Sequence, residues 1–140
     1  MNTDYQAAVR EAIEARESSY SPYSDFMVGA ALVTAAGKIY RGCNIENAAY
    51  TPTNCAERTA FFAAIAAGER EFAAIAVAGW PKYAEPGFAF PCGVCRQVMM
   101  EFCDPDKFII ITAACEDNYK AMTLRELLPE GFGPADLSAK

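Results

Sequence analysis

Two short runs made almost entirely of apolar residues constrain the fold of this chain more than any other feature. The runs are FAAIAVAG at 72–79 and KFIIITAA at 107–114. A short run that is apolar on all sides is typical of a strand buried on both faces of a sheet. Each run follows a stretch with helical character, 54–69 before the first and 93–103 before the second. Alternation of helices with central strands predicts an α/β fold.

The first third of the chain adds a helix and a hairpin to these elements. Small and apolar residues recur at helical spacing over 3–18, which predicts a helix. FMVGAALVT at 26–34 and KIYRGC at 38–43 are strand-like runs on either side of a turn, as in a β-hairpin. The following stretch, 44–53, is polar and predicts a loop. The whole pattern indicates an α/β sandwich with a mixed sheet.

Two helix starts carry recognisable signals. Asn54 is a favourable N-cap for the helix over 54–69. Thr123 and Glu126 are spaced as a capping box, which predicts a short helix near the end of the chain. No internal repeat or linker interrupts the pattern, so we expect one domain spanning residues 1–140.

Composition excludes several classes of protein. The chain has 140 residues, of which 53% are hydrophobic, and this is too apolar for a disordered protein. Its 18 acidic and 12 basic residues give a net charge of −6, whereas nucleic-acid binders generally need a basic patch. No apolar stretch reaches the ~18 residues of a membrane span, and the N-terminus lacks a signal-peptide core. We expect a soluble, cytoplasmic protein that binds neither membranes nor nucleic acid.

The chain has six cysteines and no histidine. Disulfide frameworks belong to small secreted domains that cannot build a hydrophobic core, so reduced thiols are the better interpretation here. Cys103 and Cys115 are expected to be ordinary buried thiols, since free cysteine behaves as a small hydrophobe. Cys43 ends a strand-like run, where alternation could direct it into the core.

The other three cysteines have the spacing of a metal site. Cys55 lies in the first turn of one predicted helix, and Cys92 and Cys95 open the next. The partial positive charge of a helix N-terminus favours a thiolate over a thiol. Three such thiolates could hold zinc with its fourth position open, as in catalytic sites. A CxxC pair alone could also be redox-active or structural, and Cys43 could close the site as a fourth ligand.

Glu57 lies two residues after Cys55, on the same turn. A carboxylate in that place would lie beside the metal without having to bind it, which suits a proton shuttle. The alternative is a surface glutamate that is merely favoured by the helix dipole.

Taken together, CAE and PCxxC, each opening a helix, resemble the zinc-dependent nucleoside and base deaminases. Five stretches resemble the short cytidine deaminases nearly from end to end: FMVGAAL, RGCNIENAAY, NCAERTA, PCGVCRQV and ELLPEGF. The resemblance implies a three-layer α/β/α sandwich around a mixed sheet of about five strands. It also implies hydrolysis of cytidine and deoxycytidine to uridine and deoxyuridine plus ammonia, in pyrimidine salvage.

The same resemblance implies roles for individual residues. One Zn²⁺ per chain would be held by Cys55, Cys92 and Cys95, and Glu57 would move protons between water, the ring nitrogen N3 and the leaving amino group. Three thiolates leave the zinc site at −1, so a cation should compensate, and Arg58 corresponds to the family's arginine. Arg96 could do the same or be a solvated surface charge.

Substrate contacts are also implied by the motifs. Phe26 would stack on the pyrimidine, although an aromatic residue that begins a strand is more often core. Asn44 and Glu46 would hydrogen-bond the ribose 3′-hydroxyl. Phe132 would reach the site of a neighbouring subunit in a homotetramer with shared active sites. The full set of substrate-binding residues expected is Phe26, Asn44, Glu46, Asn47, Tyr50, Ala56 and Phe132.

Three other functions compete with this one. A deaminase for a modified cytosine nucleoside, such as an antibiotic, could share the scaffold. A non-catalytic zinc protein would use Cys43 to close the site, and a deaminase acting on RNA or DNA conflicts with the charge of −6. Two departures from the family pattern, the aromatic loop WPKYAEPGFAF at 80–90 and Val94, affect the expected base pocket.

Overall fold

A computed structural model of the protein describes residues 4–137. Across this range no helix has the length and apolar character needed to cross a membrane. The elements in chain order are α1 (Tyr5–Arg16), β1 (Phe26–Thr34), β2 (Ile39–Cys43), α2 (Ala56–Ala66), β3 (Phe72–Pro81), α3 (Gly93–Phe102), β4 (Ile109–Cys115), β5 (Asn118–Thr123), α4 (Leu124–Leu127) and a 3₁₀ turn (Pro134–Leu137).

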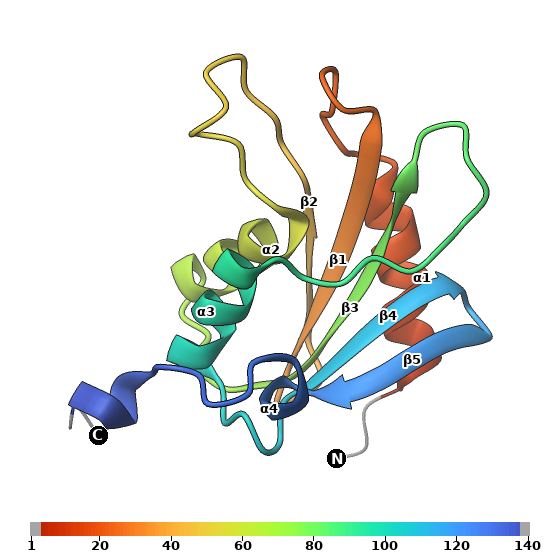
Figure 1. Ribbon diagram of the computed structural model, residues 1–140. Helices are drawn as coiled ribbons and strands as arrows, with labels where there is room; N and C mark the ends of the chain where they lie inside the picture. Colours follow the sequence, from red (N-terminus) through yellow and green to blue (C-terminus); the bar gives the residue numbers. More distant parts are fainter. Residues whose placement is uncertain (1–3, 138–140) are drawn as a thin grey trace.

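The strands form one mixed sheet in the order β2-β1-β3-β4-β5. β3 and β4 pair in parallel through a crossover that contains α3, and the other neighbouring strands pair antiparallel. α1 covers one face of the sheet, and α2 and α3 cover the other (Figure 1). The α/β sandwich with a mixed sheet, expected from the apolar runs, is therefore confirmed.

Each face of the sheet has its own buried cluster. On the α1 face, Ala31 and Val33 of β1 pack with small residues of α1 such as Ala8 and Ala12. On the opposite face, Ala30 and Leu32 pack with the residues of α2 and α3. Successive side chains of a strand point to opposite faces, so β1 contributes to both clusters.

Two glycines let helices lie directly on the sheet. A Cβ atom on Gly42 of β2 would come within 2.4 Å of the Ala56 carbonyl oxygen, at the start of α2. A Cβ atom on Gly29 of β1 would come within 2.1 Å of the Ala12 carbonyl oxygen in α1. Both contacts are with backbone, which cannot move aside as a side chain can. Gly42 thus fixes the height of α2, and of Cys55 just before it, above the sheet.

Two predictions at element boundaries were wrong. α2 is capped by Cys55, not by Asn54, because the Asn54 backbone forms an extended bridge with Ile45. Strand β5 was missed among the sequence runs, because none of its residues is fully buried and its sequence, NYKAMT, is not an apolar run. The predicted capping box of Thr123 and Glu126 is present at the start of α4. Thr3, the first residue of the predicted N-terminal helix, lies outside the described residues.

Candidate active site

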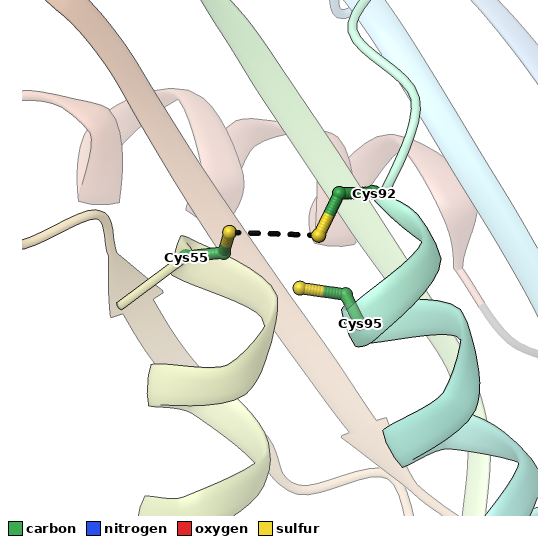
Figure 2. A group of neighbouring side chains, drawn as sticks. All are labelled: Cys55, Cys92 and Cys95. Atoms are coloured by element: carbon green, nitrogen blue, oxygen red, sulfur yellow. Dashed lines mark hydrogen bonds between the residues drawn. The ribbon is translucent and has the colours of Figure 1, made fainter. Parts of the chain in front are cut away.

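Cys55, Cys92 and Cys95 meet where α2 and α3 begin (Figure 2). Cys55 and Cys92 are the N-cap residues of the two helices, with extended backbones that leave the helical path. Neither side chain makes a capping hydrogen bond, so neither sulfur atom is bound to the backbone of its own helix start. Cys95 lies one turn into α3 and is buried. The predicted convergence of these cysteines from two helix starts is present.

The spacing of the sulfur atoms fits a tetrahedral zinc site. The three Sγ atoms lie within 4.8 Å of one another, and those of Cys55 and Cys92 are 3.8 Å apart. Zn–S bonds of about 2.3 Å in a tetrahedron place two sulfurs about 3.8 Å apart. Within residues 4–137 this is the one group of metal-ligating side chains gathered so closely.

Cys43 does not belong to this group. It is half-buried at the end of β2, and its thiol donates a hydrogen bond of 3.4 Å to the Ser18 carbonyl oxygen. Burial raises the pKa of this thiol, which disfavours a thiolate ligand. Cys103 is only partly buried, packed against the core cluster under α2 and α3, whereas Cys115 is exposed and donates to Asp117, so the prediction of a buried Cys115 was wrong. Cys115 ends β4 at the turn to β5, where the sheet no longer covers it.

Arg58 places a positive charge beside the cysteines. Its Nη2 donates to the Cys55 sulfur at 3.4 Å, and its buried Nε has no hydrogen-bond partner among the described residues. A hydrogen bond with Cys95, assisted by Arg58, lowers the pKa of Cys55 to about 5 in spite of burial. The same shared proton raises the pKa of Cys95 far above its ordinary value. One thiolate is therefore already favoured before any metal binds.

Arg96, the other candidate cation, has a different environment. Its Nε donates to the Pro91 carbonyl at 2.7 Å and its Nη1 to the Leu127 carbonyl at 2.6 Å. The side chain thus ties the residue before Cys92 to the end of α4. The guanidinium of Arg96 is therefore bound to backbone carbonyls, whereas that of Arg58 contacts the Cys55 sulfur.

Glu57 is buried, with 5% of its surface exposed, and is not the exposed helix residue of the alternative interpretation. Burial raises the pKa of its carboxyl group to about 7, because a carboxylate loses its hydration there. The side chain lines a cavity of about 350 Å³ together with the N-cap residues Cys55 and Cys92. The carboxyl group and two of the three thiols therefore share one cavity.

The cavity contains part of the predicted substrate-binding set. Phe26, Asn44 and Ala56 line it, and Phe26 is 38% exposed and so not a core residue. Sequence reasoning named none of the other lining residues individually and expected only the loop at 80–90 near the base pocket. Val28 could have been found from strand alternation with Phe26, but the loop residues carry no such periodic signal. The missed residues are Val28, Thr53, Asn54, Val77, Ala89 and Phe90.

Glu46, Asn47 and Tyr50 line a neighbouring hollow of about 340 Å³, with Tyr23, Ser24 and Thr53. Thr53 lines both spaces, so the two adjoin. The Glu46 carboxylate accepts hydrogen bonds from the backbone N–H groups of Tyr23 and Ser24 at 2.9 and 3.2 Å, and from the Ser24 hydroxyl. Burial alone would raise the pKa of Glu46, but these hydrogen bonds lower it below the ordinary value.

Asn44 continues the β2 edge beyond the last strand residue. Its Nδ2 donates to the Phe26 carbonyl at 2.7 Å, and its Oδ1 accepts from the Val28 N–H at 3.0 Å. The amide therefore holds the first residues of β1 at the rim of the cavity. The Oδ1 also accepts from the Ser19 hydroxyl at 2.5 Å, so both of its lone pairs are used, and only the second proton of the NH₂ group remains for a ligand.

Two further sequence features lie away from the cavity wall. Phe132 lines neither hollow; it is 56% exposed, and its carbonyl accepts a hydrogen bond of 2.8 Å from Gln97 of α3. Val94 is 58% exposed and is not among the lining residues. The aromatic loop at 80–90, by contrast, supplies Ala89 and Phe90 to the wall.

Comparison with known proteins agrees with this geometry. The sequence pattern of the family described as the cytidine and deoxycytidylate deaminase zinc-binding region matches residues 2–112. A cytidine deaminase from Sporosarcina psychrophila is 47% identical over 135 residues, which cover 96% of each chain.

Solved structures show the same fold. The crystal structure of a cytidine deaminase from Burkholderia pseudomallei is 47% identical, with a TM-score of 0.84 over 93% of this chain and all of that chain (100%). A cytidine deaminase from Mycobacterium tuberculosis is 32% identical, with a TM-score of 0.80 over 94% of this chain and 99% of that one. The matched region contains Cys55, Glu57, Cys92 and Cys95. The chain therefore belongs to the family of cytidine and deoxycytidylate deaminases.

Proposed function

We propose that this protein hydrolyses cytidine and deoxycytidine to uridine and deoxyuridine with release of ammonia. The observation that carries the proposal is the shared cavity, where the buried Glu57 carboxyl group lies beside Cys55 and Cys92. The 47% identity to a cytidine deaminase over 96% of each chain supports the choice of cytidine. The single sheet, with a buried cluster on each face, supports one domain over residues 1–140.

Cys55, Cys92 and Cys95 would hold one zinc ion per chain. Bound there, Zn²⁺ would supply Lewis-acid activation of a water molecule. Three protein ligands with an open fourth position characterise a catalytic and not a structural zinc site. The position of Cys43, outside the sulfur cluster and hydrogen-bonded to Ser18, argues against a closed four-cysteine site.

Glu57 would carry out the proton transfers. Its carboxylate takes a proton from the attacking water and delivers it to N3 of the pyrimidine, which makes C4 more electrophilic. The water oxygen then forms its bond to C4, which becomes tetrahedral and carries both the new hydroxyl group and the amino group. Glu57 then takes the proton of the new C4 hydroxyl and passes it to the amino nitrogen; the C4–N bond breaks as the C4 carbonyl forms, and ammonia leaves. The buried place of Glu57 in the cavity wall keeps bulk water from competing for these protons.

Arg58 would compensate the negative charge of the three thiolates. Its contact with the Cys55 sulfur at 3.4 Å supports this role. A cation there reduces the electron density that the thiolates donate to a bound metal ion, which keeps the metal a stronger Lewis acid.

The nucleoside would occupy the cavity and the adjoining hollow. Phe26 would stack on the base, and the Ala56 backbone at the start of α2 would face it. Asn44 and Glu46 would bind the ribose 3′-hydroxyl, which deoxycytidine retains. Asn47 and Tyr50 would close the sugar side, since they line the hollow that adjoins the cavity at Thr53.

We also propose a homotetramer in the cytoplasm that serves pyrimidine salvage. The exposed Phe132, away from its own cavity, suits a residue that reaches a neighbouring site. Exposed apolar residues on α2, such as Phe62 with 49% of its surface accessible, suit a contact between subunits.

A paired assay of wild type and Glu57→Gln tests the function. Wild type should convert cytidine and deoxycytidine, followed by the absorbance change, with one zinc per chain by metal analysis. Glu57→Gln should keep the zinc and lose about 10²–10⁴-fold in kcat. Wild type that binds zinc but leaves both nucleosides unchanged would overturn the substrate assignment, and turnover of a modified cytosine nucleoside would then favour the antibiotic-type alternative.

A further inference from the structure

Arg16, the last residue of α1, is a buried cation on the face of the sheet opposite the cysteines. Only 5% of its surface is exposed. Its Nε donates to the Met27 carbonyl at 3.0 Å, and its Nη2 donates to the carbonyls of Trp80 at 2.8 Å and Pro81 at 3.3 Å. Burying a guanidinium is costly unless it makes several charge-assisted hydrogen bonds, so these contacts are its main stabilising partners.

The three carbonyls belong to the last rungs between β1 and β3. Phe26 pairs with Pro81 and Met27 with Trp80, and we call these four residues the β1–β3 corner. Arg16 supplies donors to both strands there, and its guanidinium carbon lies 4.2 Å above the Trp80 ring, a cation–π contact.

The corner is also one wall of the cavity. Phe26 lines the cavity, and one edge of its ring lies over Gly79, where a Cβ atom would be 3.3 Å from Phe26 Cε1 and 3.1 Å from Ala89 Cβ. The loop that carries Ala89 and Phe90 starts at Lys82, whose N–H donates to the Asp25 carbonyl at 2.7 Å. Any shift of the corner would therefore move the Phe26 ring and the loop together.

We infer that Arg16 is a positioning residue for nucleoside binding: by joining the ends of β1 and β3 from behind the sheet, it sets the place of Phe26 and of the loop wall. The inference rests on the proposed function. Arg16 contacts neither the cavity nor the cysteines, so its effect should be on substrate affinity and not on the proton transfers at Glu57.

The first test compares Arg16→Met, Arg16→Lys and the control Arg10→Met. Arg10 lies on the same helix but pairs at the surface with Glu116 at 2.5 Å. Arg16→Met should raise KM for cytidine about tenfold with kcat changed less than about threefold and zinc content unchanged. Arg16→Lys keeps the charge but loses the guanidinium that donates to several carbonyls at once, so it should give an intermediate KM. Arg10→Met should match wild type. An unchanged KM in both Arg16 variants would overturn the inference.

A double-mutant cycle with Phe26→Ala separates positioning from general loosening. If Arg16 acts through the Phe26 ring, Arg16→Met should raise KM by less than about twofold in the Phe26→Ala background. Equal effects in the two backgrounds would show that Arg16 does not act through Phe26. Arg16→Lys serves in the same cycle if Arg16→Met does not fold.

Hydrogen exchange provides a readout that does not depend on catalysis. Arg16→Met should speed exchange in peptides covering 24–30 and 80–91, with peptides of α2 and α3 unchanged. Uniformly faster exchange, or none, would overturn the inference. If wild type fails to convert cytidine, the proposed function falls, and the exchange measurement still decides whether Arg16 holds the corner.

Discussion

The two faces of the sheet are built from different kinds of residue. The buried cluster on the α1 face is mostly alanine and valine, including Ala12, Ala31 and Ala76. The cluster under α2 and α3 contains large side chains such as Phe61 and Phe108. Small residues let α1 lie flat against the strands, whereas on the other face two helix starts meet over the strand ends and leave a cavity of about 350 Å³. One face mainly supports the fold, and the other holds the candidate active site.

Removing one sulfur should have the largest effect, and only on the α2/α3 face. Cys95→Ser should lose the zinc ion and at least about 10³-fold in kcat/KM, because two thiolates hold the metal poorly. Metal analysis and the cytidine assay measure both. Cys115→Ser is the matched control, since Cys115 is exposed at the end of β4. Full zinc occupancy in Cys95→Ser would contradict the assignment of this residue.

On the α1 face, we expect Gly29→Ala to lower the stability of the folded protein. The added Cβ would lie 2.1 Å from the Ala12 carbonyl oxygen, so α1 must move away from the sheet. We expect a loss of about 3–4 kcal/mol in the free energy of unfolding, at the upper end of single substitutions. Urea denaturation measures it, with Gly87→Ala as control because nothing lies within 4 Å of the added Cβ there. Equal stabilities of the two variants would refute the tight packing of α1.

Arg58→Gln tests the α2/α3 face in another way, because it removes the charge beside the cysteines without removing a metal ligand. We expect kcat to fall about 10- to 100-fold with zinc retained, since a cation near the thiolates is lost. Arg58→Lys should recover part of the activity because it keeps the charge. Steady-state kinetics and metal analysis on the same preparations decide, and wild-type kcat in Arg58→Gln would exclude a compensating role.

The smallest effect is expected at Thr123, whose capping box begins α4 on the α2/α3 face. Thr123→Ala removes the hydrogen bond to the Glu126 N–H and should cost about 1 kcal/mol of stability. Turnover of cytidine should not change, because Thr123 is not among the residues that line the cavity. Thermal unfolding and the activity assay together test this; a change in KM would show that α4 influences the site.

Local signals explain how much of the fold could be predicted. β1 and β3 are runs of apolar residues, and the Thr123 cap is a motif of four residues, so neighbours in the chain suffice to identify them. β5 could not be found this way, because its strand character comes from pairing with β4 and not from its own polar residues. Asn54 was misassigned as a cap for the same reason, since its bridge to Ile45 is a contact across a loop.

The candidate site shows the same difference between residues that local sequence signals identify and residues that long-range contacts place. The cysteines and Glu57 were predictable because each occupies a fixed place at a helix start. For Ala89 and Phe90 the sequence indicated only the loop at 80–90 and not the residues themselves, because distant contacts hold that loop. The Thr112 hydroxyl donates to the Ala89 carbonyl at 2.7 Å, and the Lys120 ammonium lies 4.5 Å from the Phe88 ring centroid. No periodic pattern in the sequence of the loop predicts either contact.

The absence of capping hydrogen bonds at Cys55 and Cys92 has an evolutionary consequence. Serine or aspartate at either position would cap its helix, a change typically worth about 1 kcal/mol of stability. The same change would remove a sulfur atom from the cluster. Selection for a sturdier fold and selection for turnover therefore oppose each other at these two residues. A lineage that no longer needed the activity would be expected to drift first at these positions, gaining stability as the site disappears.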